Sequence, residues 1–305
     1  MRPKAAGEYA KQSRAANTQR AYKAAWQEFS AWVAQHGAEA LPADVPTVVA
    51  YLTALAEAGA KYSTISVKRA AIGAAHRTAR QNDPTAAEDV KLIMGGIARK
   101  HGRASTKKAP LAAEELRRMI DALPDTLAGQ RDRALILVGW AGAFRRSELV
   151  AVNVGHVRLN GELKITLPKS KTDQEGAGMV KVIPVLDDKT LCPVTALREW
   201  LDAAEVKSGA IFRQIDRWGN LRARRLTAQS VAAIVKAAAE RAGIDPRQFA
   251  GHSLRSGFIT TAASAGVESR DIMAVTGHKS EAVMRGYIQD AGLGAKRAIK
   301  KAFGE

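Results

Sequence analysis

The chain has 305 residues and a mass of 32.6 kDa, which is enough for about two average domains. Apolar residues make up 46% of it and charged residues 25%, ordinary values for a globular protein that exclude a largely disordered chain. Its 47 Lys and Arg residues outnumber 30 Asp and Glu residues, and the formal charge of +17 favours a polyanionic partner, either a nucleic acid or an anionic membrane surface.

The amino-terminal region carries helical patterns. Its first residues lack the apolar segment of a secretory signal, so a cytoplasmic, nucleoid-associated location is expected. Asn17 or Thr18 can cap a first helix, whose apolar side chains recur at helical spacing up to Val33. Two further helices are predicted at residues 45–58 and 63–80.

A polar, basic segment follows at residues 100–110, which contain no acidic residue and end in a helix-breaking proline. We therefore predict a first domain at residues 1–104, a linker at 105–110 and a second domain at 111–305. The charge divides almost evenly, with +9 over residues 1–108 and +8 over residues 109–305. Both domains are therefore expected to contact the same polyanion.

Helical patterns and two strand patterns make up the second region. Its longest apolar stretch, residues 134–144, has 11 residues, fewer than the roughly 20 that span a bilayer, and predicts a buried helix. Residues 162–167 and 179–185 alternate in polarity, which predicts two strands joined by a polar hairpin. The single cysteine, Cys192, excludes an intramolecular disulfide and a cysteine-based metal site. The predicted helices are residues 114–123, 131–144, 145–152, 193–204, 228–242, 253–265 and 269–275. The predicted fold class is thus mainly α with a small antiparallel β-sheet in the C-terminal domain.

Four patterns in the second region carry side chains that can act on a phosphate, and each is weak when taken alone. Taken one at a time, a surface ion pair, a capping histidine and a packed tyrosine are the better explanations, and the lysine can be an ordinary hairpin charge. The patterns are Arg145 with Glu148, Lys171 between the two strands, His252 with Arg255, and His278 nine residues before Tyr287.

Taken together and in this order, the patterns resemble the tyrosine recombinase (phage integrase) family, in particular Cre- and Xer-type site-specific recombinases. Residues 18–36 and 44–76 also look like the helical, SAM-like core-binding domain of these enzymes. The resemblance implies a two-domain architecture, with this domain followed by an α+β catalytic domain. The strings that carry it are Gly142-Ala-Phe-Arg-Arg-Ser-Glu-Leu149, Pro168-Lys-Ser-Lys-Thr172, Gly251-His-Ser-Leu-Arg-Ser-Gly257, Thr276-Gly-His-Lys279 and Gly286-Tyr-Ile288.

The resemblance implies that Tyr287 is the nucleophile and that His252 accepts its proton. Arg145 and Arg255 would clamp the non-bridging oxygens of the phosphate, because guanidinium groups stay charged and offer paired donors. The family motif places the catalytic arginine three residues before the acidic residue, which selects Arg145 over its neighbour Arg146.

The leaving group of such a reaction is a deoxyribose 5′ hydroxyl, which needs a general acid. Lys171 takes that role by resemblance, with Lys169 as the local competitor. Glu148 would orient neighbouring catalytic groups, and His278 would donate a hydrogen bond to the phosphate. No metal and no cofactor are expected, since the arginines would supply the positive charge.

DNA binding is expected to rest mainly on phosphate contacts, with base contacts from helices in the major groove. The resemblance leaves open which basic residues contact bases. The candidates in the first domain are Thr18, Arg20, Lys23, Ser63, Lys68 and Arg69, and those in the second are Arg222, Arg224, Arg225, Thr227 and Gln229.

The implied function is site-specific recombination of double-stranded DNA, by a 3′-phosphotyrosine intermediate and a four-way junction, at an inverted-repeat recognition site. The implied assembly is a homo-tetramer on DNA, in which the C-terminal helix at residues 291–305 docks on a neighbouring subunit; packing against its own domain is the alternative. Neither a membrane partner nor any particular accessory protein is indicated. The alternatives left open are a type IB topoisomerase, a telomere resolvase, or a non-catalytic DNA-binding protein.

Overall fold

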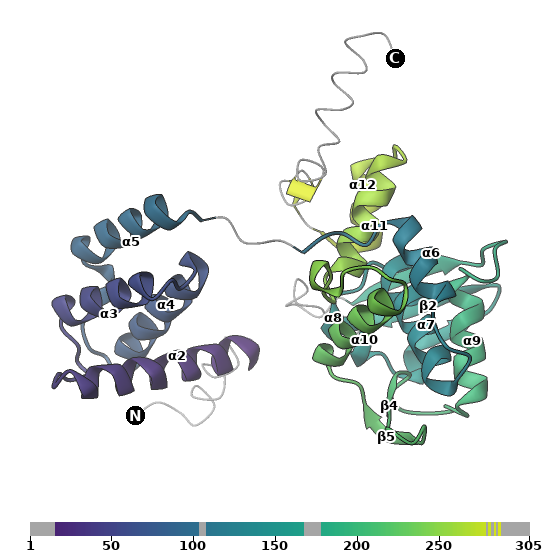
Figure 1. The fold of residues 1–305 in the computed structure, drawn as a ribbon, viewed down its shortest axis with the longest axis horizontal. Coiled ribbons are helices and arrows are strands. Elements are labelled where there is room, and N and C mark those ends of the chain that lie inside the picture. The colour runs from purple at the N-terminus through teal and green to yellow at the C-terminus, as the bar shows by residue number, and fades with distance from the viewer. Residues whose placement is uncertain are drawn as a thin grey trace, which may run out of the picture. The chain divides into compact units, whose positions relative to one another are not determined.

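The computed structural model describes residues 16–103, 108–167 and 178–278, together with residues 280, 281, 284, 286 and 287 (Figure 1). The chain divides into two compact units, Met1–Thr106 and Lys107–Glu305. This division falls inside the polar, basic segment of residues 100–110. Each unit has a hydrophobic core of its own.

The described part of the first unit is helical (Figure 1). The three predicted helices correspond to α2, α3 and α4, but the predicted cap is wrong, because Asn17 and Thr18 already lie inside α2. Helix α5 was not predicted. The acidic Glu88 and Asp89 in its first turn interact favourably with the helix dipole. The elements are α2 (Ala16–Gln35), α3 (Val45–Glu57), α4 (Tyr62–Thr78), the 3-10 helix η1 (Pro84–Ala86) and α5 (Glu88–His101).

Side chains from α2, α3 and α4 meet in the core of the first unit. Phe29 is fully buried, and its ring lies edge-on to that of Tyr51 with centroids 5.1 Å apart. Ile72 is fully buried as well, and the next turn of α4 carries His76, whose Nε2 accepts the backbone N–H of Ala43 at 2.9 Å. These contacts join α2 and α4 to α3 and the loop before it, and α2 and α4 also pack directly against each other. These are the two helices that carry the predicted DNA contacts of this unit.

The second unit is mainly helical with small antiparallel sheets, as the sequence predicts. Its helices are α6 (Ala113–Asp121), α7 (Leu127–Ala141), α8 (Arg146–Ala151), α9 (Pro193–Ala203), α10 (Ala228–Arg241), α11 (Ser253–Ser264) and α12 (Ser269–Thr276), with 3-10 turns η2 (Val154–His156) and η3 (Pro246–Gln248). Its strands are β1 (Val157–Leu159), β2 (Glu162–Leu167), β3 (Met179–Pro184), β4 (Arg213–Ile215) and β5 (Leu221–Arg225).

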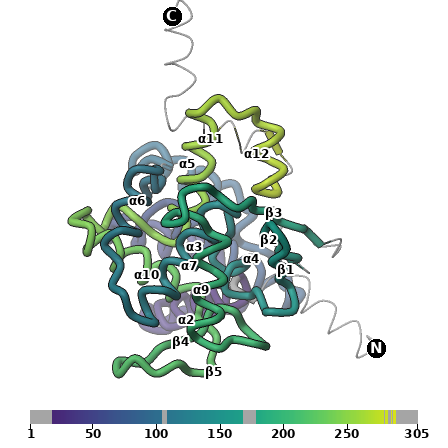
Figure 2. The backbone as a smooth tube through the Cα atoms, turned by 90° about the vertical axis from the view of Figure 1, so that its right-hand side faces the viewer, coloured from purple at the N-terminus to yellow at the C-terminus, as the bar shows by residue number. Residues whose placement is uncertain are grey.

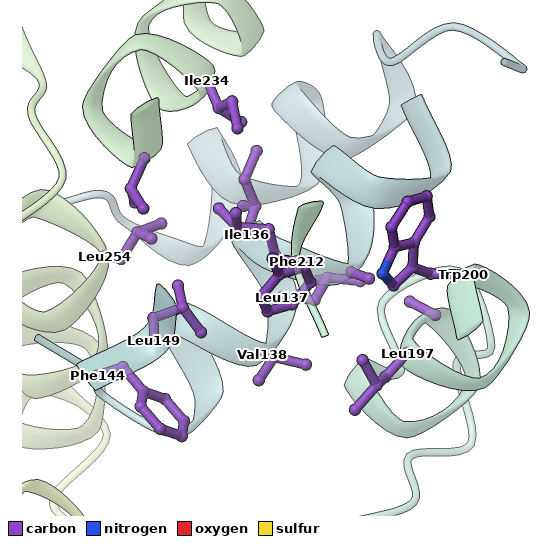
Figure 3. Packing of buried hydrophobic residues seen from close by; sticks show 14 of the residues in the cluster. Ile136, Leu137, Val138, Phe144, Leu149, Leu197, Trp200, Phe212, Ile234 and Leu254 are labelled. Carbon is purple, nitrogen blue, oxygen red and sulfur yellow. The ribbon is translucent and has the colours of Figure 1, made fainter. Parts of the chain in front are cut away.

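Helix α7 runs through the core of the second unit. Thr126 caps it by accepting the backbone N–H of Gly129, and almost every residue from there to Gly139 is buried. Leu197 and Trp200 of α9 pack against this helix (Figure 3). The structure thus confirms the buried helix predicted from the apolar stretch.

Strands β1, β2 and β3 form an antiparallel sheet in that order (Figure 2). Ile165 of β2 pairs with Lys181 of β3, and alternate residues of both strands face the core. The end of α12 lies next to β3, where Lys181 bonds to Val275. Strands β4 and β5, which the sequence did not predict, form a separate hairpin that extends away from the helices (Figures 1 and 2).

Candidate active site

Arg145 and Glu148 form a fixed pair at the start of α8. Arg145 has an extended backbone and stands just before the helix, so its own N–H donates to Glu148 Oε2 at 3.0 Å. Its Nη1 donates to the other carboxylate oxygen at 2.7 Å. Glu148 is buried, whereas the Arg145 side chain keeps 21% of its surface exposed. The carboxylate therefore orients a guanidinium group that a ligand can still reach.

Arg255 lies in the first turn of α11 and is fully buried. It makes a hydrogen bond to the turn that precedes α8. Its Nη1 donates to the carbonyl of Ala143 at 2.7 Å. Ala143 has a φ of 47°, in the left-handed region that side chains disfavour, and this turn directs its carbonyl at Arg255. Burial and the neighbouring Arg145 lower the pKa of the Arg255 guanidinium to about 10, while Glu148 and Tyr287 act in the opposite direction.

His278 is held between Arg255 and Thr276. Its Nε2 lies 2.9 Å from Nη2 of Arg255, and its Nδ1 lies 3.0 Å from Oγ1 of Thr276. Because a guanidinium group can only donate, Nε2 accepts here and the ring proton sits on Nδ1. Burial, followed by Arg255 and Arg145, lowers the pKa of His278 to about 4, so the ring is neutral at pH 7.

Tyr287 faces His252, which precedes α11. The tyrosine hydroxyl lies 2.9 Å from Nε2 of His252. Partial burial of the imidazole, followed by the charges of Arg255, Arg146 and Arg145, lowers the pKa of His252. A neutral imidazole at hydrogen-bond distance is able to accept the hydroxyl proton.

Arg146 points along a different side of the site from Arg145. It packs across Gly251, so closely that a Cβ atom at Gly251 would collide with Cδ of Arg146. A side chain at Gly251 would therefore displace the Arg146 side chain. Arg145, not Arg146, bonds to Glu148.

Lys181 of β3 is a buried cation at the site that no sequence motif singled out. Its Nζ donates to the Val275 carbonyl at 2.5 Å and lies 5.0 Å from the ring centroid of Phe144. Burial lowers its pKa to about 8, with Glu148 raising it and Arg255 and Arg145 lowering it further. The available signal was strand alternation, since Lys181 shares the inward face of β3 with Ile183.

Several predicted positions lie outside the described residues. Lys171 and its competitor Lys169 fall between the end of β2 at Leu167 and the start of the described chain at Gly178. The predicted C-terminal helix at residues 291–305 also lies outside them. The roles assigned to these segments stay predictions.

The DNA-contact candidates of the second unit lie on β5 and at the start of α10. Arg222 and Arg224 are exposed, and Arg222 forms an ion pair with Asp216 at 2.5 Å. Thr227 caps α10 by accepting the N–H of Ser230 at 3.1 Å, and Gln229 is exposed in the first turn. Their contacts with DNA stay predictions.

Arg225 differs from these candidates because its side chain is engaged within the unit. Its Nη1 donates to the Val150 carbonyl at 2.5 Å and its Nη2 to Oδ1 of Asn153 at 2.6 Å. Arg225 therefore ties the end of β5 to the last turn of α8 and to the chain that follows it. A DNA contact from Arg225 would have to compete with these bonds.

The six candidates of the first unit lie on helices α2 and α4. Arg20, Lys23 and Ser63 are exposed. Lys68 forms an ion pair with Glu28, which joins α4 to α2. Thr18 and Arg69 are partly exposed. Their contacts with DNA are also untested predictions.

The assembled groups suit one anionic, tetrahedral centre. Arg145 and Arg255 present positive charge next to the Tyr287 hydroxyl and a neutral imidazole, a combination that can bind a phosphodiester and activate attack on it. Among the described residues, no group of three or more His, Cys, Asp or Glu side chains is arranged to hold a metal ion. None of the described helices is long and apolar enough to cross a membrane.

Two family profiles match this chain. The profile of the Phage integrase family matches residues 110–292, and that of the Phage integrase N-terminal SAM-like domain matches residues 9–82. One profile lies in each unit, and that of the Phage integrase family includes every described residue of the candidate site.

Curated relatives point in the same direction. An integrase/recombinase XerD homolog of Selenomonas ruminantium is 38% identical over 296 residues, which are 95% of this chain and 86% of the relative. A tyrosine recombinase XerD of Xanthomonas axonopodis pv. citri is 32% identical over 205 residues, 66% of this chain and 62% of that protein.

Solved structures share the fold at low sequence identity. XerH site-specific recombinase, in a post-cleavage complex with a palindromic difH substrate, matches with a TM-score of 0.59 at 17% identity, over 85% of this chain and 72% of that one. A lambda integrase dimer bound to a COC′ core site gives a TM-score of 0.58 at 18% identity, over 92% of this chain and 91% of that one.

Proposed function

The chain belongs to the phage integrase family and is a tyrosine site-specific recombinase of the Cre/Xer type, and on this premise we propose that it cuts and rejoins DNA through a covalent bond between Tyr287 and a 3′ phosphate. The reaction forms the bond from the Tyr287 oxygen to phosphorus and breaks the bond from phosphorus to the deoxyribose 5′ oxygen. The phosphodiester energy stays in the phosphotyrosine, so a 5′ hydroxyl can reverse the attack without ATP.

The observation that carries this proposal is the contact of 2.9 Å between the Tyr287 hydroxyl and Nε2 of His252. A tyrosine hydroxyl keeps its proton at neutral pH and must lose it as it attacks. The lowered pKa of His252 favours the neutral ring that can take this proton. His252 is thus the proton acceptor, and Tyr287 the nucleophile.

Arg145 and Arg255 bind the non-bridging oxygens, on which negative charge grows during the attack. The bonds from Arg255 to Ala143 and from Arg145 to Glu148 hold the two groups in place before DNA arrives, so little reorganisation is needed. His278 joins them when the phosphate replaces it as the partner of Nη2 of Arg255. The ring stays neutral: its proton shifts from Nδ1 to Nε2, Nε2 donates to the phosphate, and Nδ1 accepts from the Thr276 hydroxyl.

The leaving 5′ oxygen becomes a strongly basic alkoxide unless it is protonated as it departs. Lys171 supplies that proton from the hairpin between β2 and β3. Lys171 lies in the sequence between β2 and β3, which pair antiparallel, and this placement supports a role for the connecting segment as an arm that reaches the scissile phosphate.

The partner is double-stranded DNA that carries inverted repeats, and the working assembly is a tetramer that exchanges one pair of strands at a time through a four-way junction. The XerH and lambda integrase structures are themselves DNA complexes of fold relatives, which supports the DNA partner. Exchange of the C-terminal segment, residues 291–305, between subunits links the protomers.

The test starts with a DNA site selected for binding from a random library, then uses that site with a nick next to the cleavage position. Loss of the short fragment traps the covalent complex, which we detect as a protein–DNA species that survives denaturing electrophoresis. Wild-type protein should form this species. Site-bound protein that forms none would overturn the enzymatic proposal and leave a DNA-binding protein.

Tyr287→Phe is the matched variant, because it removes only the nucleophilic oxygen. It should abolish the covalent complex and keep the affinity for DNA within about threefold, since a hydroxyl that meets one phosphate adds little to many backbone contacts. DNA with two sites separates recombinase from topoisomerase: exchanged products fit the proposal, and relaxation without exchange fits the alternative.

A further inference from the structure

Lys181 is a buried charged group at the site to which the proposed mechanism gives no task. It is 3% exposed and lies on the inward face of β3, opposite Ile165 of β2. Burying an ammonium group is unfavourable unless bonds and charges compensate for the lost water. The contacts that Lys181 makes there point to its task.

Those contacts join two parts of the site that are far apart in the sequence. Its Nζ donates to the Val275 carbonyl in the last turn of α12, and it lies over the ring of Phe144, the residue before Arg145. The charged groups around it are Glu148, which favours its charge, and Arg145 and Arg255, which oppose it.

A second contact joins the same strand to the same turn. Met179, two residues before Lys181 and on the same face of β3, packs against Gly277, where a Cβ atom would lie 2.8 Å from the Met179 sulfur. Gly277 ends α12 in the left-handed conformation, with a φ of 71°. Strand β3 therefore contacts the residues on both sides of Thr276.

His278 depends on this turn for its position. Thr276 bonds to its Nδ1, and its Nε2 meets Arg255. Because Lys181 and Met179 of β3 contact this turn, they fix the position of the His278 ring relative to the guanidinium group of Arg255.

We propose that Lys181 is a positioning residue that anchors the end of α12 on strand β3 and thereby holds His278 in place to act on the scissile phosphate. This inference rests on the proposed cleavage reaction. Lys181 itself meets neither the phosphate nor the leaving group in this role, so its effect passes through His278.

The test is a double-mutant cycle on covalent-complex formation with the nicked substrate, at saturating DNA. Lys181→Met keeps the length and the apolar stem and removes the donor. We expect it to slow cleavage by about tenfold or more, because misplacement of a catalytic group by ~1 Å can cost ~100-fold, and to leave DNA affinity unchanged. Lys164→Met is the control, since Lys164 lies on the outer face of the same sheet in an exposed pair with Glu162.

His278→Ala supplies the other arm of the cycle. If Lys181 acts through His278, the double variant cleaves no more slowly than His278→Ala alone. Independent, multiplying effects would overturn the proposal, as would wild-type cleavage by Lys181→Met. A fall in DNA affinity and thermal stability that accounts for the slower cleavage would also overturn it, by making the role merely structural.

The cycle also separates this inference from the proposed function. If the wild-type protein forms no covalent complex, the function fails. If the wild-type protein forms the complex and Lys181→Met forms it equally fast, only the inference fails.

Discussion

In the proposed mechanism, His278 has one set of partners without DNA and another set when the phosphate is bound. Without DNA its Nε2 accepts from Arg255, and its proton sits on Nδ1 facing Thr276. The guanidinium group thus has a partner that is neutral and easily displaced, which avoids an ion pair with a carboxylate that would compete with the phosphate. The same contact keeps the pKa of His278 low, because a proton on Nε2 would face the charge of Arg255.

This arrangement makes folding stability depend on acidity. The pKa of His278 falls from 6.5 to about 4 in the folded protein, and that of His252 is lowered as well. Between pH 6.5 and about pH 4, His278 is protonated in the unfolded chain and neutral in the folded protein. The contribution of this group to stability is therefore full above pH 6.5 and is lost as the pH falls toward 4.

We therefore expect His278→Gln to lose less stability than the wild type between pH 6.5 and pH 4.5, measured as the urea midpoint across that range. Above pH 7 both states leave the ring neutral, so the difference between the two proteins should stay constant there. Parallel curves over the whole acidic range would contradict the assigned burial of a neutral ring.

At the scale of elements, the turn at the end of α12 sets the position of His278. Gly277 combines a left-handed backbone with a close approach to Met179, whereas Gly266, which follows the end of α11, has a φ of 88° and no atom within 4 Å of the place that a Cβ would take. Both glycines have a positive φ, but only Gly277 has a neighbouring side chain that an added Cβ would contact.

We expect Gly266→Ala to cost about 1–2 kcal/mol, the strain of a side chain in the left-handed region, and Gly277→Ala to cost more because Met179 must also move. Urea unfolding of both variants measures the difference. Gly277→Ala should in addition slow covalent-complex formation, whereas Gly266→Ala should not. Equal costs would show that the Met179 contact is easily relieved.

A similar comparison applies to the start of α10. Thr227 is its side-chain cap, and replacing such a cap with alanine typically costs about 1 kcal/mol. Thr227→Ala should therefore lower the urea midpoint of the protein, and Thr227→Ser, which keeps the accepting oxygen, should retain most of the wild-type value. Loss of equal size in both variants would rule out the cap as the cause.

Most helices and the two longer strands of the first sheet were predictable, whereas α5 and the other strands were not. Strands β2 and β3 and most of the helices follow from alternation and helical spacing. Strand β1 has only three residues, and β5 reads Leu-Arg-Ala-Arg-Arg, so neither carries an apolar alternation to detect. These strands form because they pair with neighbouring strands, and the periodicity of a single segment carries no information about its partner.

At the scale of the whole molecule, the charge of +17 is shared between two units, and the basic residues of the two units differ in their surroundings. The first unit contributes basic helices, while the second combines a basic surface with buried cations at the candidate site. Lys181 and Arg255 are both almost completely buried, so part of the net charge cannot serve general binding to a polyanion.

The proposed assembly gives a prediction at this scale. Deletion of residues 292–305 should leave binding to a single site and covalent-complex formation largely intact, because both use residues up to Tyr287. It should abolish pairing of two sites, since the proposed link between subunits is lost. Electrophoretic mobility of one-site and two-site DNA measures both. Normal recombination by the truncated protein would refute the exchange of this segment.

The sequence by itself determined the mainly helical fold class, most of the helices, the two strands β2 and β3 and the ordered set of side chains that identifies the family, because these are local patterns or fixed spacings. The tertiary structure alone decided that Arg255 meets Ala143 and His278, that Arg225 is turned inward and that Lys181 is a buried part of the site. Each of these contacts joins residues more than twenty positions apart, and packing, not spacing along the chain, brings them together.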